Sequence, residues 1–222
     1  MDGDAELPIF PLSNVVLFPG VQTPLHLFEP RYRQLAEHTL VANRRIGMVT
    51  VPPEHVAEME ADPPVYPVGC AGVIAQSQRL PDGRYNLVLH GTHRFRITGE
   101  LPRGGDRLYR VAQVEPLLDP YPGSERSRVA ELRRSIVELV ASLVRHSDPE
   151  RAEQISPALF RGVDDASFVN SLGNSLAFPP EEKQGLLEAP DVPARFERLE
   201  GLLSFRIAQL GAPGGGRPGS VH

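Results

Sequence analysis

Two residue types that carry much of protein chemistry are almost missing from this 222-residue chain. The one cysteine, Cys70, cannot form a disulfide bond within the chain or build a zinc site from several thiolates. It lies in an apolar stretch, which indicates a buried structural thiol. Of the 23 basic residues only Lys183 is a lysine, and the others are arginines. Long apolar runs are missing too. None extends over about 18 residues, so we expect no membrane-spanning helix.

The shortage of lysine argues against two kinds of enzyme. A phosphate-binding loop of the form G-x-x-x-x-G-K-[ST] needs a lysine that contacts the terminal phosphates. Lys183 stands between Glu182 and Gln184, so that motif is absent. A serine–lysine peptidase needs a lysine whose pKa is lowered by burial or by positive neighbours, and these neighbours have the wrong sign. The sequence therefore predicts a solvated Lys183, no catalytic residues and no cofactor.

The charge balance is acidic, with a net charge of −5 and a pI near 5.8. This argues against broad, nonspecific binding to nucleic acids, because such binding depends on basic groups that neutralise phosphates. The first residues, Met1–Glu6, are acidic and lack the basic and then apolar order of a secretory signal. We therefore expect the cytoplasm as the compartment.

Small polar clusters have structural explanations. His90 and His93 lack the further ligands that zinc needs, so we predict no metal site. Asp164–Asp165 precede an apolar helical pattern, and one of the two is expected to cap that helix. Glu29 and Arg31 flank the start of an earlier helix and are expected to form an ion pair or a cap.

Residues 1–118 have the pattern of a β-rich domain. Short apolar runs are interrupted by prolines, which cannot donate to a strand ladder, so we expect an irregular sheet closed on itself like a small barrel. One helix begins at Pro30, where a missing N–H costs nothing. Its inward face is expected to carry Tyr32, Leu35, Ala36, Leu40 and Val41. The expected strands are Ile46–Val51, Val68–Ser77, Tyr85–His90 and Tyr109–Val114, with turns at Leu80–Gly83 and Gly91–His93, and with Phe95 and Ile97 toward the core.

The period of the apolar residues becomes helical after Pro120–Gly123. The first helix, of about 20 residues, is expected to bury one stripe of apolar side chains. A second helix carries Phe168 and Leu172, a short third begins at Pro179, and Asp191 caps the last. The residues expected to face inward on the first helix are Val129, Leu132, Ile136, Leu139, Val140 and Leu143. Those expected to face inward on the last helix are Phe196, Leu199, Leu203, Ile207 and Leu210. We expect two domains, 1–118 and 119–211, and a disordered Gly- and Pro-rich tail, 212–222.

Several short segments follow one another in a characteristic order: Leu7–Leu12, Asn14–Gly20, Leu25–Tyr32, Ile46–Val49, Leu80–Leu89, Arg94–Ile97, Tyr109–Leu117 and Glu181–Glu188. Taken in this order, they resemble the amino-terminal substrate-binding domain of Lon proteases. The resemblance covers about residues 7–210. It implies an α+β fold, with a PUA-like β pseudo-barrel that contains one inserted helix, followed by a C-terminal helical bundle. The ATPase and the peptidase that follow this module in Lon look absent, so a noncatalytic recognition module is expected.

The resemblance implies protein clients rather than a chemical substrate. By analogy the module would bind unfolded or tagged protein segments, and a separate ATP-dependent protease is a candidate partner. The oligomeric state stays open. Such binding requires exposed apolar surface or a free sheet edge. The candidate contact residues are Leu25, Phe28 and Tyr32 near the first helix, with Phe168 and Leu172 from the helical part.

An RNA-binding module is the alternative. Seven arginines lie between Arg79 and Arg110, opposed locally by Asp82, Glu100 and Asp106. PUA-like folds include RNA binders, and arginines beside tyrosines suit RNA contacts. The candidate RNA contacts are Arg84, Arg94, Arg96 and Arg110. A protein scaffold with one stable partner and no affinity for unfolded chains is a further class.

Overall fold

The computed structural model describes residues 6–211, which form two compact units. Unit 1 comprises residues 6–119 and 170–188, and unit 2 comprises residues 120–169 and 189–211. The first break lies one residue from the predicted boundary. Residues 170–188, however, belong with the β-rich unit and not with the remaining helices. The predicted tail, 212–222, lies outside the described residues.

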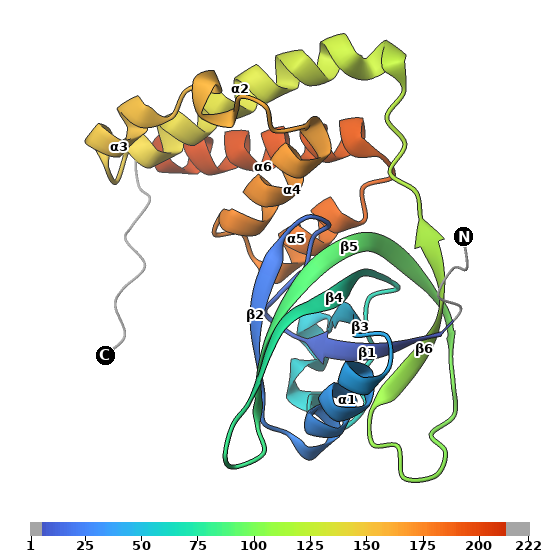
Figure 1. Ribbon diagram of the computed structural model, residues 1–222. Coiled ribbons are helices and arrows are strands. Elements are labelled where there is room, and N and C mark those ends of the chain that lie inside the picture. The colour runs from blue at the N-terminus through green and yellow to red at the C-terminus, as the bar shows by residue number, and fades with distance from the viewer. Residues whose placement is uncertain (1–5, 212–222) are drawn as a thin grey trace. The chain divides into compact units, whose positions relative to one another are not determined.

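Unit 1 is built on a six-stranded sheet whose strands follow the order β2-β5-β4-β3-β1-β6 (Figure 1). An additional β5–β6 pairing closes β5, β4, β3, β1 and β6 into a ring, while β2 remains an edge strand on β5. Among the strand pairs within residues 6–211, the β1–β3 pair alone is parallel. The strands are β1 (Glu6–Leu12), β2 (Gln22–Leu27), β3 (Arg45–Thr50), β4 (Val68–Arg79), β5 (Tyr85–Glu100) and β6 (Arg110–Leu117). The closed sheet that the prolines predicted is therefore present.

Strand β5 is longer than expected, and the predicted turn at Gly91–His93 is wrong. The strand runs through these residues without a break, and Thr92 is an extra residue where the register to β4 shifts between Ala71 and Gly72. Such a bulge bends a strand. The bend lets β5 pair with β2 before the bulge and with β6 after it. Gly91 is required for another reason: a Cβ there would collide with the backbone oxygen of Phe18.

The interior of the ring is apolar and tightly packed around Phe95, which is fully buried. Two glycines let neighbouring strands approach the aromatic ring of Phe95. A Cβ on Gly69 would lie 2.6 Å from Phe95 and 2.5 Å from the Met48 oxygen, and one on Gly47 would lie 2.8 Å from Leu7. The predicted inward position of Phe95 is confirmed, and Ile97 packs against the same cluster, which also contains Leu7, Ile9, Val49, Ala71, Ala112 and Val114.

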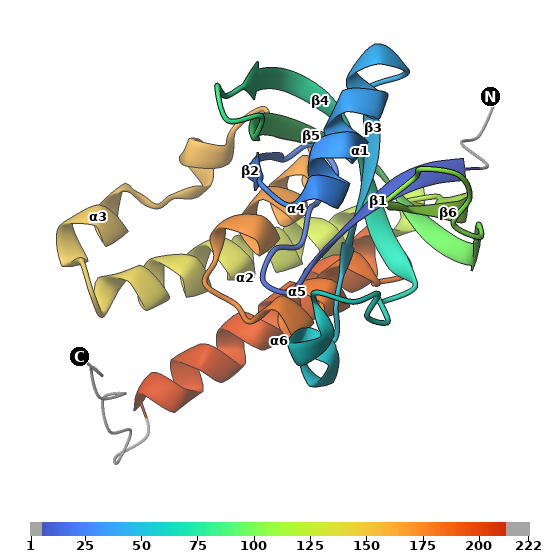
Figure 2. The same ribbon diagram turned by 90° about the horizontal axis from the view of Figure 1, so that it is seen from below.

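Helix α1 (Pro30–Val41) connects β2 to β3 and begins with the predicted proline. It packs against β1 (Figures 1 and 2), where the rings of Tyr32 and Phe10 meet edge to face at 4.5 Å. Val41, which was expected to face inward, is 87% exposed, and Thr39 is buried in its place. The helix accepts a buried threonine because the hydroxyl donates back to the Leu35 oxygen at 2.8 Å. The short helix η1 (Pro53–Glu58) lies in the loop that follows β3.

Helix α5 (Pro180–Leu187) belongs to unit 1 because buried polar side chains bind it to the strands. Arg94 of β5 donates to the Leu187 oxygen at 2.8 Å, and Gln184 donates to the Val68 oxygen at 2.9 Å. Arg94 also donates to Leu118 and to the carboxylate of Asp119. One buried guanidinium thus joins three chain segments, which sequence periodicity could not indicate.

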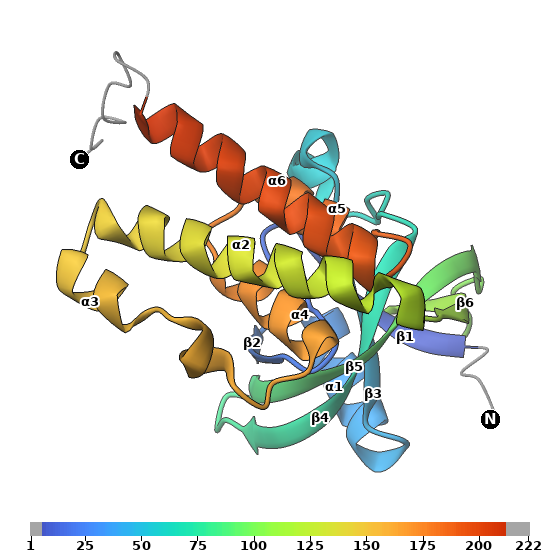
Figure 3. The ribbon, with the colours of Figure 1, turned by 90° about the horizontal axis from the view of Figure 1, so that it is seen from above.

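Unit 2 is helical, and its long helices α2 and α6 run side by side (Figure 3). Asp148, Asp164 and Asp191 cap helices, each accepting from a backbone N–H three residues later. This settles the choice between the two adjacent acids in favour of Asp164. Helix α3 was not predicted. The helices are α2 (Arg126–Arg145), α3 (Pro149–Gln154), η2 (Gly123–Glu125), η3 (Pro157–Phe160), α4 (Asp165–Ser175, shared with unit 1) and α6 (Val192–Gly211).

The inward stripes of unit 2 are largely as predicted. Val129, Ile136 and Val140 of α2 are buried, as are Phe196, Leu199 and Leu203 of α6. Leu210, predicted inward, is exposed near the end of α6. Among residues 6–211 no helix is both long and apolar enough to cross a membrane.

Candidate functional site

A groove on unit 1 combines exposed apolar side chains with charges that pair among themselves. We call it the Phe28–Leu108 groove. It has a volume of about 650 Å³ and is open to solvent. Its sides come from the turn between β2 and α1, from the loop after η1 and from the loop between β5 and β6. Its lining residues are Phe28, Glu29, Pro30, Arg31, Glu60, Ala61, Asp62, Arg103 and Leu108.

The apolar part of the groove is exposed. Phe28 is 59% exposed and Leu108 is 45% exposed. Phe28 follows β2 directly, and its ring stacks beside His26 with 6.1 Å between ring centroids. Two large apolar side chains that line one groove cost free energy in water unless another molecule covers them.

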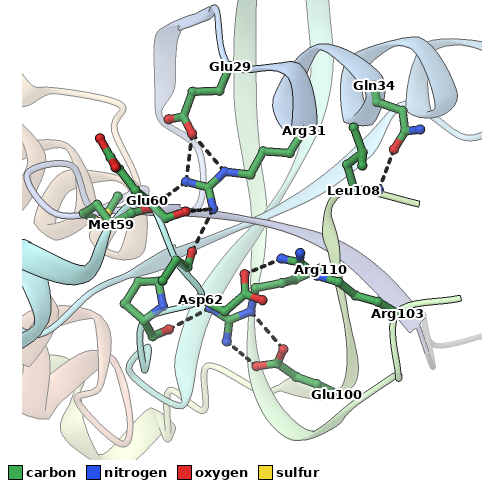
Figure 4. A network of polar contacts seen from close by, with 12 residues as sticks. Glu29, Arg31, Gln34, Met59, Glu60, Asp62, Glu100, Arg103, Leu108 and Arg110 are labelled. Carbon is green, nitrogen blue, oxygen red and sulfur yellow. Dashed lines mark hydrogen bonds and ion pairs between the residues drawn. The ribbon is translucent and has the colours of Figure 1, made fainter. Parts of the chain in front are cut away.

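Arg31 binds the loop after η1 to the first turn of α1, as Figure 4 shows. Its Nε donates to the Glu29 carboxylate at 2.9 Å, which confirms the predicted ion pair. Its Nη1 donates to the Ala61 oxygen at 2.8 Å and its Nη2 to the Met59 oxygen at 2.5 Å. Nη2 also lies 2.8 Å from the Glu29 carboxylate, and Nη1 lies 3.5 Å from the backbone oxygen of Glu60. Each of the five N–H groups of Arg31 therefore has a partner within unit 1, which leaves none for a ligand.

A second set of contacts positions the loop that carries Leu108 (Figure 4). The side chain of Gln34 on α1 accepts from the Leu108 N–H and donates to the Asp106 oxygen, both at 2.7 Å. Arg103 of the same loop pairs with Asp62 on the opposite side. Helix α1 therefore positions both loops, and the groove exists before any ligand binds.

Arg110 of β6 is bonded both to β5 and to the loop after η1, which carries Asp62. It forms two hydrogen bonds to the Glu100 carboxylate, one of them 2.9 Å long, and a third to the Pro63 oxygen at 2.7 Å. Tyr32 is only 5% exposed and packs against Phe10 of β1. Burial raises the pKa of Tyr32 above 10, and the Arg31 charge opposes this rise.

Of the five residues predicted to contact clients, Phe28 alone has a mostly exposed side chain. Leu25 and Tyr32 are buried in unit 1. Phe168 is buried in unit 2, where it lies between Phe160 and Phe196 with ring centroids 5.0 and 5.7 Å away. Leu172 is partly buried in the part of α4 that belongs to unit 1.

Sequence reasoning missed Leu108, Glu60 and Asp62 as groove residues. All three lie in loops, where no period marks which side a residue faces. The one available signal was an isolated leucine after the polar and Gly-rich stretch Arg103–Arg107.

The arginine-rich region is largely neutralised within unit 1. Five of its seven arginines pair with carboxylates: Arg79 with Glu37, Arg84 with Asp82, Arg94 with Asp119, Arg103 with Asp62 and Arg110 with Glu100. Three of these acids lie outside the stretch whose charge was counted. Of the predicted RNA contacts, Arg94 is only 2% exposed, and Arg96 is exposed beside its cross-strand neighbour Glu115. The region therefore presents far less positive charge than its sequence indicates.

The remaining candidates for chemistry are structural. Cys70 is fully buried in β4. Lys183 is less solvated than expected: its side chain is half-buried, its ammonium group donates to the Asn174 oxygen at 2.6 Å, and burial lowers its pKa. In the described part of the chain no three His, Cys, Asp or Glu side chains lie close enough to bind a metal ion.

Comparisons with known proteins agree on one family. The family model of the ATP-dependent protease La (LON) substrate-binding domain matches residues 6–204. The Lon protease of Salinispora arenicola is 30% identical over 205 residues, and that of Cytophaga hutchinsonii is 26% identical over 204 residues. Each match covers 92% of this chain and 24% of the relative, so the chain spans about a quarter of the length of these proteases.

Solved structures show the same fold. The N-terminal domain of a Mycobacterium avium complex Lon protease superposes with a TM-score of 0.66 at 17% identity. A Lon N-terminal domain protein from Xanthomonas campestris superposes with a TM-score of 0.55 at 23% identity. Each match covers 90% of this chain and 98% of the other.

Proposed function

The chain belongs to the family of Lon substrate-binding domains, and from this premise we propose that it binds protein segments through the Phe28–Leu108 groove. The observation that carries the proposal is the exposure of Phe28 and Leu108 on a groove whose arginines are already bonded within the protein. Hydrogen bonds of the free protein would persist on binding, so the binding free energy would come mainly from covering apolar surface.

The clients we propose are unfolded or tagged segments. Such segments expose large apolar side chains that a folded protein keeps inside. Fully burying a Phe or Leu side chain stabilises a complex by about 1.5–3 kcal/mol, which is about tenfold or more in affinity. A shallow groove with two such residues suits weak, broad recognition of many sequences.

The edge strand β2 is a second route by which a segment could bind, through strand addition. Pro24 lies in the middle of this strand and removes one N–H from it. We therefore propose the groove, not the edge, as the main contact.

We propose that unit 1 is a PUA-like pseudo-barrel with α1 as the inserted helix, that unit 2 is a helical bundle, and that the two act as domains. The closed ring of strands and the compactness of each unit favour this. An RNA-binding function receives no support, because the family match and the fold matches are to Lon domains and most of the arginines are paired.

We further propose that bound segments pass to an ATP-dependent protease and that this takes place in the cytoplasm. The relatives that carry this region are Lon proteases. Crosslinking and pull-down from the native cell extract, with and without nuclease, tests this. Recovery of a protease together with unfolded proteins would support it, and nuclease-sensitive recovery of RNA would contradict it.

The direct test measures binding of a labelled, permanently unfolded protein such as reduced carboxymethylated lactalbumin. Phe28→Ala and Leu108→Ala should each weaken binding by about tenfold, with unchanged unfolding curves. Val41→Ala is the matched control, because Val41 is an exposed apolar residue of the same unit outside the groove. Equal affinity of all three variants and the unsubstituted protein would contradict the proposal.

A further inference from the structure

The charges of the Phe28–Leu108 groove are unequal once internal pairs are removed. Three carboxylates and two guanidinium groups line it. Arg31 is bonded to Glu29 and to backbone oxygens, and Arg103 is bonded to Asp62. Within the described residues, the Glu60 carboxylate makes no hydrogen bond or ion pair, and only its backbone oxygen contacts Arg31. The groove therefore offers a ligand apolar surface and one negative charge.

From this arrangement we propose that the groove selects extended segments in which a large apolar side chain lies within two residues of an arginine or lysine. The inference rests on the proposed function and names its substrate class. The apolar side chain would lie between Phe28 and Leu108, and the basic one would pair with Glu60.

The geometry of an extended chain fits this pattern. Side chains two residues apart lie on the same face of a strand, about 7 Å from each other. The groove, at about 650 Å³, is large enough for more than one side chain. An apolar residue and a basic residue at positions i and i+2 would thus enter it together.

Charge also argues against other occupants. A second copy of this chain carries a net charge of −5, and an anionic membrane surface is negative as well. Either would bring negative charge toward Glu60. A segment with a basic residue brings the opposite charge, and like-charge contact in the wrong partner gives selectivity.

The test measures how tightly short labelled peptides of equal length bind to the full chain. Each has a central phenylalanine, and the residue two positions away is Arg, Gln or Glu. Fluorescence anisotropy measures their affinities at low and high salt. An exposed ion pair contributes about 0.2–1 kcal/mol, so the Arg peptide should bind about threefold tighter than the Gln peptide and about tenfold tighter than the Glu peptide. The preference should shrink at high salt.

Two variants assign the preference to one carboxylate. Glu60→Gln should remove the discrimination among the three peptides, and Glu60→Arg should reverse it. Glu54→Gln is the control, because Glu54 is an exposed acid of the preceding helix η1 that does not line the groove. It should leave the order unchanged.

The outcomes separate this inference from the proposed function. If the three peptides bind equally and Phe28→Ala still weakens them, the charge preference is wrong and the apolar groove stands. If Glu60→Gln keeps the full preference, Glu60 is not its source and the inference is overturned. If no peptide binds, or Phe28→Ala has no effect on any, both proposals fail.

Discussion

The interior of the strand ring and the Phe28–Leu108 groove use similar residues in opposite ways. In the interior, Phe95 is covered completely, and glycines let two backbones approach its ring. In the groove, the arginines bond to other groups of the protein, while Phe28 and Leu108 remain exposed. The interior buries its apolar surface, and this burial stabilises the fold. The groove keeps its apolar surface free, which is what a binding site requires.

The largest effect should come from filling the interior. Gly69→Val adds atoms where even a Cβ would lie 2.6 Å from Phe95. Overpacking usually costs about 1–3 kcal/mol and occasionally more, and the nearby Met48 oxygen cannot move without breaking the sheet. We therefore expect the free energy of unfolding, measured in urea, to fall by more than about 3 kcal/mol. Gly104→Ala is the control, since nothing lies within 4 Å of that position. Equal stability of both variants would mean that the interior is looser than described.

The next effect contrasts two neighbouring aromatic residues. Tyr32→Ala removes a buried ring and should cost about 3 kcal/mol of stability. Phe28→Ala removes a mostly exposed ring and should change stability by less than about 0.5 kcal/mol, although we expect it to weaken binding of the unfolded protein. Chemical unfolding and the binding assay above give both numbers. If Phe28→Ala destabilises as much as Tyr32→Ala, Phe28 belongs to the core and the contrast between interior and groove fails.

An intermediate effect is expected at Arg31, which shapes the groove without being available to a ligand. Arg31→Lys keeps the charge but cannot bond to Glu29, Met59 and Ala61 together. We expect a loss of about 1.5 kcal/mol in stability and faster hydrogen exchange in residues 59–62. Arg84→Lys, at an exposed ion pair with Asp82, is the control and should be near neutral. Unchanged exchange in the loop would contradict the role given to Arg31.

The smallest effect concerns pH. Burial raises the pKa of Tyr32 in the folded state, whereas in the unfolded chain it returns to about 10. The folded state then keeps its proton longer, so this contribution to stability is full below pH 10 and is lost as the pH rises through the folded-state pKa. Tyr32→Phe should make the decline of stability above pH 10 shallower. Some decline should remain, since the pKa values of Tyr66, Tyr109 and Tyr121 are also raised. An unchanged slope would show that Tyr32 ionises as freely as in the unfolded chain.

Much of the local structure followed from chain chemistry. Pro30 begins α1, the turn before Tyr85 joins β4 to β5, and Asp164 and Asp191 cap their helices. These features depend on residues close in sequence. The errors have long-range causes. Gly91 is a glycine because Phe18 lies against it, and it marks no turn. Residues 170–188 belong to unit 1 because Arg94 and Gln184 bind α5 to the strands.

The candidate site was predicted only in part. Phe28 was named because it lies near the junction of the strands and the first helix, but Leu25 and Tyr32 were named for the same reason and are buried. An apolar residue next to a strand end carries no mark of whether it will be covered. The positive charge expected for residues 79–110 was too high for a similar reason. Glu37, Asp62 and Asp119, which lie outside this stretch, pair with its arginines.

By itself the sequence determined the family, the closed β-rich part and the helices that follow, because prolines, glycines and apolar periods act over a few residues. Only the tertiary structure decided which charges cancel and which apolar side chains stay exposed. Both depend on loops that α1 positions, in one case through a hydrogen bond between residues 74 positions apart. The physical reason is that burial and ion pairing are properties of neighbours in space, and in this protein those neighbours are far apart along the chain.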